Sequence, residues 1–428
     1  MNAFARDTVT LIAERAARLL AGLAVAVFCA RVLGPREYGL YSYAVSLVVL
    51  FSFLGQAGLD QILVRELVRR DGAADQTLMA ALSLRVVGSV GAGALALLTV
   101  SVASPPELPA ALLVSLLALA GVLQTSHTID AWLQAQQRFR ASSAAKTVAV
   151  LLAAVARILA VLSSAPLLGL ALVSIGEAAL TGVLLGLAAS RRGLRLRNAV
   201  AAFDREERHR LWLLARPMLA SSFAVALYAR ADVFLLGQLS ARSEVGQYSA
   251  AASLSEAFYL LPIALMTAAS PRLAERYRTD EAAFRRECLA LVRYSSLAGF
   301  CVALTLTALA EPLVAVVYGD AYPRTAQILA VHAWSTWMVF VSVASEPWYL
   351  QQGLQRAYLR KTMLAATANL LLNLWLIPRY GGVGAAIATV VSYALSAFGG
   401  NLLWRDTRGF FFRQVRAMLL LPLPRGRL

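Results

Sequence analysis

Apolar residues run through this chain in long stretches, separated by short polar connections. Twelve stretches approach or exceed the roughly 20 residues that a helix needs to cross the hydrocarbon core of a bilayer. They lie near residues 9–33, 38–62, 76–103, 108–133, 143–163, 166–190, 211–238, 244–270, 288–310, 323–350, 361–378 and 382–404. The pattern predicts an all-α integral membrane protein with twelve transmembrane helices. The 59% hydrophobic composition agrees, because a soluble domain of 428 residues cannot hide that much apolar surface.

The basic residues alternate between successive connections. One set of connections, with the C-terminal tail, holds 28 Lys and Arg, and the opposite set holds five. The connection 351–361 is in the basic set, with Arg356, Arg360 and Lys361. Because Lys and Arg collect on the cytoplasmic side of membrane proteins, the alternation predicts that both termini are cytoplasmic. It also accounts for the net charge of +16 without a nucleic-acid partner.

The sequence at the start of one predicted helix occurs twice in the chain. Residues 36–47 read "REYGLYSYAVSL" and residues 243–254 read "SEVGQYSAAASL", with seven identities in twelve ungapped positions. Each stretch begins a predicted helix from the outer face, the second and the eighth of the twelve. Two halves in the same orientation form a parallel repeat, an arrangement found in transporters.

The longest polar connection separates the two halves. We therefore predict a six-helix half at 1–190, a cytoplasmic linker at 191–210 and a second six-helix half at 211–404. The tail 405–428 interleaves Arg with apolar residues, and we expect this basic amphipathic segment to lie on the cytoplasmic leaflet.

Three segments resemble a known family. "ARVLGPREYGLYSYAVSLVVLFSFLGQAGLDQILVRE" (30–66) resembles the first signature of the polysaccharide-biosynthesis flippases. These are the Wzx-like oligosaccharide flippases of the multidrug/oligosaccharidyl-lipid/polysaccharide (MATE/MOP) superfamily. "YARADVFLLGQLSARSEVGQYSAAASLSEAFYLLPIALMTAASPRLAERY" (228–277) is similar to the matching segment of the second half, and "NLLLNLWLIPRYGGVGAAIATVVSYAL" (369–395) to the last helix hairpin.

The resemblance implies two pseudo-symmetric six-helix bundles around a central cavity, in the inner (cytoplasmic) membrane. It implies a flippase that moves a polyprenyl-diphosphate-linked oligosaccharide to the outer leaflet for cell-surface polysaccharide biosynthesis. The implied partners are this glycan, the membrane lipids and, as candidates, other polysaccharide-assembly proteins.

Arginines lie inside the predicted helices, at Arg15, Arg18, Arg85, Arg157, Arg216 and Arg230. A charge at bilayer depth costs about 2.5–3.5 kcal/mol or more unless it faces protein or water, so these residues predict a hydrated internal cavity. The planar guanidinium suits a diphosphate. The predicted diphosphate ligands are Arg18, Arg85, Arg157, Arg216 and Arg230. Alternatives are a Glu14–Arg18 pair, snorkelling of Arg15 and Arg216 to the cytoplasmic interface, and an Arg230–Asp232 pair.

The membrane charges differ between the halves. They sum to +2 in the first half and to −1 in the second, which favours an anion site in the first and a cation-coupling site in the second. Candidates for coupling to a proton or sodium ion are Glu177, Glu256 and Glu346. No other cofactor and no metal site are predicted. Predicted polar residues lining the cavity are Gln124, His127, His332, Asn369 and Asn373. Hydrogen bonds between helices are the alternative for each.

The connections between the predicted helices favour a transporter over an enzyme. Those on the outer side are too short to hold acid/base groups, and the sequence shows no P-loop that would indicate an ATP-driven pump. The alternative function is a cation-coupled small-molecule exporter of the same superfamily.

Overall fold

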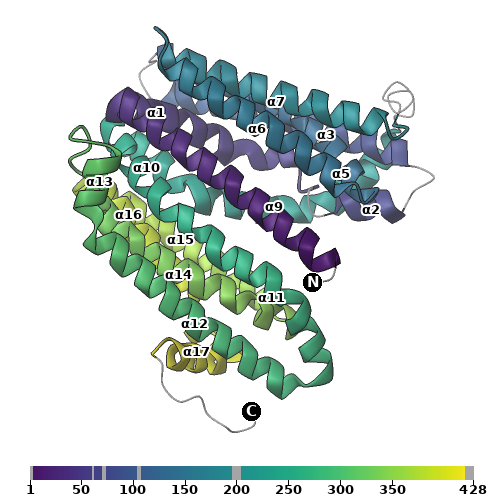
Figure 1. The fold of residues 1–428 in the computed structure, drawn as a ribbon, viewed down its shortest axis with the longest axis vertical. Coiled ribbons are helices and arrows are strands. Elements are labelled where there is room, and N and C mark those ends of the chain that lie inside the picture. The colour runs from purple at the N-terminus through teal and green to yellow at the C-terminus, as the bar shows by residue number, and fades with distance from the viewer. Residues whose placement is uncertain (1–2, 60–61, 70–73, 104–107, 195–203, 420–428) are drawn as a thin grey trace. The chain divides into compact units, whose positions relative to one another are not determined.

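The computed structural model describes residues 3–59, 62–69, 74–103, 108–194 and 204–419, and every regular element among them is a helix (Figure 1). The structure describes the backbone of Glu14, Arg15 and Pro217 but not their side chains. The helices up to the central connection are α1 (Ala3–Gln56), α2 (Leu63–Arg69), α3 (Ala74–Ala103), α4 (Leu108–Leu123), η2 (Gln124–Ser126), α5 (His127–Ala135), α6 (Phe139–Val161) and α7 (Pro166–Ser190). After it come α9 (Arg205–Leu239), α10 (Arg242–Glu256), η3 (Ala257–Tyr259), α11 (Leu260–Thr279), α12 (Glu281–Ala308), α13 (Ala310–Val317), α14 (Thr325–Gln351), α15 (Gln355–Tyr380), α16 (Gly382–Ala397), η4 (Gly399–Leu402) and α17 (Arg405–Met418).

Each of the twelve predicted stretches falls on helical structure, which confirms the all-α class. Within the part of the chain that the structure describes, eight spans are long and apolar enough to cross a membrane: Leu20–Gln56, Ala74–Val102, Pro109–Ala135, Phe139–Val161, Pro166–Ser190, Arg242–Thr279, Glu281–Ala308 and Thr325–Gln351. The first of them contains parts of two predicted stretches, joined at Gly34. The count of twelve crossings and the cytoplasmic position of the termini stay predictions.

Gly34 makes the break inside α1. Its backbone lies at φ 74° and ψ 170°, a combination that only glycine adopts readily. Pro35 follows, and its fixed φ suits the first position of the helix that resumes there. The Gly-Pro pair of the sequence is therefore a kink between two helices in series.

The chain forms two compact units. Unit 1 comprises residues 1–35 and 235–428, and unit 2 comprises residues 36–234. The first segment of α1 thus groups with the C-terminal helices: the Tyr322 hydroxyl donates to the Ala30 carbonyl at 2.6 Å. Most of α9 groups with the N-terminal helices, where Phe234 stacks on Tyr43. The units differ from the predicted halves by an exchange of the two leading helices.

Five equivalent positions of the repeated segment are buried in both copies. Positions 38, 39, 43, 44 and 47 are buried, and so are their equivalents 245, 246, 250, 251 and 254. In unit 1 the reason is visible at Gly246, where a Cβ would lie 1.9 Å from the Pro35 carbonyl oxygen. The motif therefore encodes a helix face that accepts a very close neighbour.

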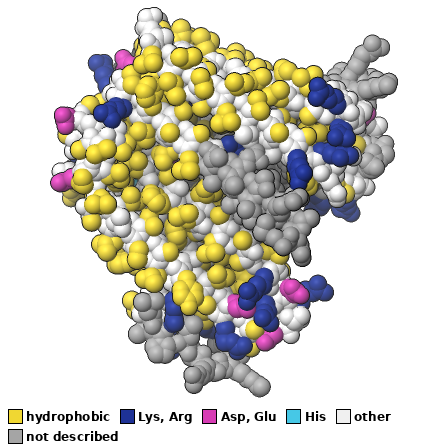
Figure 2. Space-filling model, in the orientation of Figure 1, with side chains coloured by type: hydrophobic (Ala, Val, Ile, Leu, Met, Phe, Trp, Pro, Cys, Tyr) yellow, Lys and Arg dark blue, Asp and Glu magenta, His cyan; other side chains and the backbone are white. Residues whose placement is uncertain are grey.

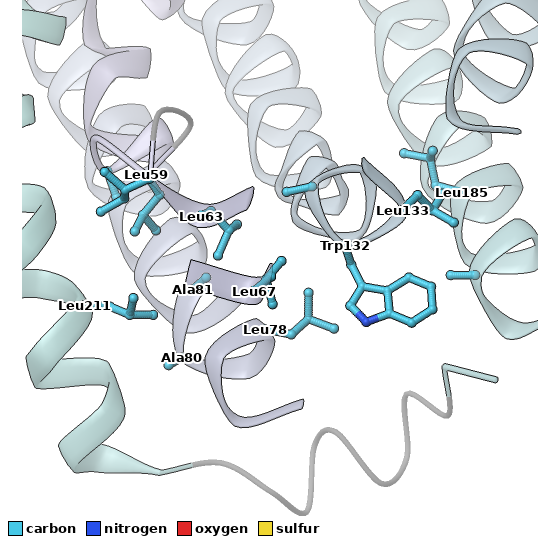
Figure 3. Packing of buried hydrophobic residues seen from close by; sticks show 14 of the residues in the cluster. Leu59, Leu63, Leu67, Leu78, Ala80, Ala81, Trp132, Leu133, Leu185 and Leu211 are labelled. Carbon is cyan, nitrogen blue, oxygen red and sulfur yellow. The ribbon is translucent and has the colours of Figure 1, made fainter. Parts of the chain in front are cut away.

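Unit 2 has a core at one end of its helices (Figure 3). Leucines of α2 and α3, such as Leu63 and Leu78, pack there with Trp132 of α5, Leu185 of α7 and Leu211 of α9. Full burial of such a side chain stabilises the fold by about 1.5–3 kcal/mol. This cluster joins the start of α9 to the N-terminal helices.

Large apolar side chains are also exposed in both units. Val102, Leu159 and Val316 are 78%, 66% and 73% exposed, and hydrophobic side chains cover much of the face in Figure 2. A soluble protein rarely presents apolar area on this scale, whereas hydrocarbon accepts it. The protein is therefore a multi-pass membrane protein.

Candidate functional site

Arg85 lies on the buried face of α3. It is 5% exposed, and Ala81 and Ser89, one turn away on either side, are buried with it. Val86, Val87 and Val90 on the opposite face are exposed. The helix next to it comes very close, since a Cβ on Gly88 would lie 2.0 Å from the Leu54 carbonyl oxygen. Arg85 is therefore enclosed by protein, as the cost of a charge in hydrocarbon requires.

Arg157 of α6 forms an ion pair with Glu177 of α7. The guanidinium Nη2 and carboxylate Oε2 are 2.5 Å apart, and both side chains are about a quarter exposed. A predicted diphosphate ligand and a predicted coupling carboxylate thus meet each other. The pair explains how both charges are tolerated between these two helices.

The other predicted diphosphate ligands are dispersed. Arg18 is half-buried in unit 1, so it belongs to a different unit from Arg85 and Arg157. Arg216 is exposed on α9, and Arg230 is half-buried on the same helix. An oxygen of Asp232 accepts a hydrogen bond from the backbone N–H of Val233, and its pairing with Arg230 stays a prediction.

The two remaining coupling candidates have different surroundings. Glu256 is exposed where α10 gives way to η3. Glu346 of α14 is half-buried, and its Oε1 accepts a hydrogen bond of 2.9 Å from the Tyr358 hydroxyl of α15. The role of either residue in ion coupling stays a prediction.

The predicted lining residues divide into two groups. Gln124 and His127 are exposed. His332 is buried, and its Nδ1 lies 2.7 Å from the Ser255 hydroxyl. Asn369 and Asn373 are also buried: Asn373 donates to Asn369 at 3.0 Å, and Asn369 donates to Ser392 of α16 at 3.1 Å. His332 and Asn369 form interhelical hydrogen bonds, as the alternative interpretation expected, whereas the bond from Asn373 lies within α15.

A charged network that the sequence did not reveal joins α2, α3 and α9. Arg210 donates two hydrogen bonds to Glu207, of 2.7 and 2.8 Å, and one of 2.9 Å to Glu66. Thr77 also donates to Glu207. The hydrogen bonds to Glu207 raise the pKa of Arg210 above its ordinary value. Arg210 is thus a permanent cation that fastens the start of α9 to unit 2.

Lys361 is the second feature that the sequence analysis missed. The alternation of basic residues predicts that Lys361 lies in a cytoplasmic connection, yet it is fully buried on α15. The available signal was its rarity, because only Lys146 and Lys361 are lysines among 40 basic residues. Among the described residues, no group of three or more His, Cys, Asp or Glu side chains could hold a metal ion.

A family described as "Polysaccharide biosynthesis protein" matches residues 28–327. The match covers more than half of the chain. The protein belongs to this family. The resemblance of the first two sequence segments is thereby confirmed, whereas the third segment (369–395), Arg18, Glu346 and Lys361 lie outside the matched residues.

Solved structures show the same fold. The chain is similar to the lipid II flippase MurJ in an inward closed conformation, with a TM-score of 0.73, 13% identity and 96% of each chain covered. It is also similar to an inward-facing multidrug resistance MATE family transporter of the MOP superfamily, with a TM-score of 0.68, 13% identity and coverages of 94% and 95%. A MOP superfamily transporter from Pyrococcus furiosus matches with a TM-score of 0.60, 14% identity and coverages of 96% and 95%. The sequence matches no curated protein.

Proposed function

We propose that the protein is a flippase for a polyprenyl-diphosphate-linked oligosaccharide in the biosynthesis of cell-surface polysaccharide. It moves this lipid from the cytoplasmic to the outer leaflet of the cytoplasmic membrane, and makes or breaks no covalent bond. The observation that carries the proposal is the family match over residues 28–327, joined to a fold similar to a lipid II flippase.

Arg85 is the residue best suited to the headgroup. A diphosphate next to an apolar tail needs fixed positive charge to leave the interface, and a guanidinium keeps its charge in any surroundings. Its planar donors can bind two phosphate oxygens at once. The buried stripe of α3 places this cation inside unit 2. Arg157, paired with Glu177 between α6 and α7, is the second candidate.

The test is flipping of a polyprenyl-diphosphate-linked glycan in liposomes that contain the purified protein. We expect Arg85→Ala to lower the rate at least 100-fold, because a lost charged contact costs about 3 kcal/mol. Arg85→Lys should recover only part of the rate, since it restores charge without the fork. Arg379→Ala is the matched control, because this exposed Arg binds the carbonyl of Trp375 on its own helix.

Wild-type flipping by Arg85→Ala at normal abundance would refute the headgroup role. A small-molecule exporter is the second candidate, favoured by the similarity to the MATE transporter. Efflux of cationic dyes by wild-type protein that does not flip the glycan would establish that function instead.

A further inference from the structure

Lys361 stands apart from the other basic residues of the protein. The chain uses Arg at 38 of its 40 basic positions, and the two lysines have opposite surroundings. Lys146 forms an ion pair with Asp130 at 2.7 Å and is partly exposed. Lys361 is fully buried, and its Nζ has no hydrogen-bond partner among the described residues. One of two lysines thus occupies a site where a permanent cation would be costly.

Two aromatic rings and one carboxylate surround the amine. Nζ lies 4.1 Å from the centre of the Tyr349 ring and 5.0 Å from that of Tyr358. The Tyr358 hydroxyl donates to Glu346, so one of the two rings links the amine to a carboxylate whose charge acts on it. Ring faces and a nearby negative charge favour an ammonium, whereas burial without a hydrogen bond disfavours it.

The elements packed around Lys361 close the site. Glu346 and Tyr349 face it from α14, and Tyr358 lies one turn earlier on α15. Asp406 of α17 pairs with Arg360, the residue before Lys361 in the chain. At η4, which has no titratable residue, a Cβ on Gly400 would lie 3.1 Å from the Lys361 Cβ.

A chain of hydrogen bonds holds the closing elements in place. The Tyr349 hydroxyl donates to Asn401 of η4, and Asn401 donates to Gln414 of α17. Gln414 in turn donates to Ser345 of α14 at 2.7 Å. Figure 1 shows α17 lying against the end of unit 1 beside α12. Movement of α17 would therefore change the access of water to the amine.

Protonation chemistry separates lysine from the arginines. An arginine cannot lose its proton in a protein, whereas a lysine amine can when its surroundings change. We propose that Lys361 is a proton-binding site, with Glu346 as its counter-charge, and that it gains and releases a proton during transport. This inference rests on the proposed transport function and identifies the coupling ion as a proton.

Direct titration tests the site independently of transport. Lysine labelled with ¹³C and ¹⁵N gives two side-chain signals in this chain, and Lys146→Arg leaves that of Lys361 alone. In lipid nanodiscs titrated from about pH 5 to pH 9, we expect this signal to change near neutral pH, within the range recorded for buried lysines. Glu346→Gln should move the midpoint to lower pH, because the carboxylate favours the ammonium. A signal that stays constant over the range would overturn the proposal.

Transport in liposomes supplies the second measurement. We expect an imposed pH gradient to accelerate flipping by the wild type and by Lys146→Arg. Lys361→Arg keeps a permanent charge and Lys361→Met has none, so the ratio of rates with and without the gradient should fall to about one in both. A wild-type response in either variant would overturn the proposal. Absence of flipping by the wild type would instead refute the transport function, and the titration would still decide whether Lys361 binds a proton.

Discussion

The interpretation of Arg157 and Glu177 changes once their contact with each other is known. In the sequence they are twenty positions apart and received separate roles, one as a phosphate ligand and one as an ion-coupling carboxylate. In the structure they form one ion pair between α6 and α7. Helix periodicity gives the face on which a residue lies, but the direction of that face toward a neighbour depends on packing.

Removal of one partner should destabilise the protein more than removal of both. Arg157→Met leaves the Glu177 carboxylate without its partner, and we expect it to lower the free energy of unfolding by about 1–3 kcal/mol, less than for a fully buried pair. The double variant Arg157→Met, Glu177→Gln should regain most of this loss. Thermal unfolding of the purified proteins measures both changes. A double variant no more stable than the single one would contradict a structural role for the pair.

Flipping by the same double variant separates the two roles of Arg157. Normal flipping means that the pair serves only the fold. Lost flipping at normal abundance means that Arg157 also contacts the headgroup, and the sequence-based prediction then holds.

The burial of Lys361 could not be predicted from the sequence. The positive-inside rule groups it with Arg356 and Arg360, but the rule describes the side of the membrane and carries no information on burial. The lysine packs against η4, about 40 residues later in the chain, and hydrogen bonds join η4 to α14 and α17. Such long-range closure has no local signal in hydropathy.

Among the elements, the transmembrane helices were predictable and their partners were not. Runs of about 20 apolar residues must form helices in a bilayer, because every backbone polar group needs an internal hydrogen bond. The same reasoning does not reveal that the first segment of α1 packs with the C-terminal helices, where Arg31 donates to the Val316 carbonyl at 3.0 Å.

α17 corrects the expectation for part of the tail. One of its faces is docked on unit 1: Phe410 stacks on Trp348 with ring centroids 3.8 Å apart, and Gln414 is buried. The opposite face exposes Arg408, Phe412 and Arg416. Contact of this exposed face with the cytoplasmic leaflet stays a prediction, and residues 420–428 lie outside the described ones.

Loss of the Phe410 ring should release α17. Large-to-small changes at packed aromatic sites cost about 3 kcal/mol, which corresponds to roughly 100-fold more of the open form. We expect Phe410→Ala to accelerate trypsin cleavage within α17 by about that factor. Phe412→Ala is the control, because this ring is 57% exposed on the same helix. Equal cleavage rates for the two variants would show that the stacked ring does not hold α17.

The chain consists of two repeated halves, and the first helix of each half belongs to the unit that the other half mainly forms. The chain passes from unit 1 to unit 2 at Pro35–Arg36 and returns at Phe234–Leu235. Each unit therefore contains one helix from the other half of the sequence, and neither unit is complete without it. Sequence comparison of the halves reveals the repeat, because residues 36–47 and 243–254 share a buried face, but it cannot reveal the exchange, which leaves the order of helices unchanged.

In alternating access, a transporter opens its binding site first to one side of the membrane and then to the other. If the two units move in this way during flipping, distances between them should change in opposite directions on the two sides. Distances between spin labels in liposomes can measure them in a Cys301→Ser background, since Cys29 and Cys288 are buried. Exposed sites on the predicted outer side are Ser164 in unit 2 and Asp320 in unit 1. On the predicted cytoplasmic side they are Gln136 in unit 2 and Arg278 in unit 1.

We expect the lipid-linked glycan to lengthen one of these two distances and shorten the other, because a unit that rocks about a central site opens one side as it closes the opposite one. The control pair, Ser164 and Gln136, lies within unit 2 and should keep its distance. Changes of the same sign on both sides, or no change during active flipping, would contradict rocking of the units. A changed control distance would place the movement inside unit 2 instead.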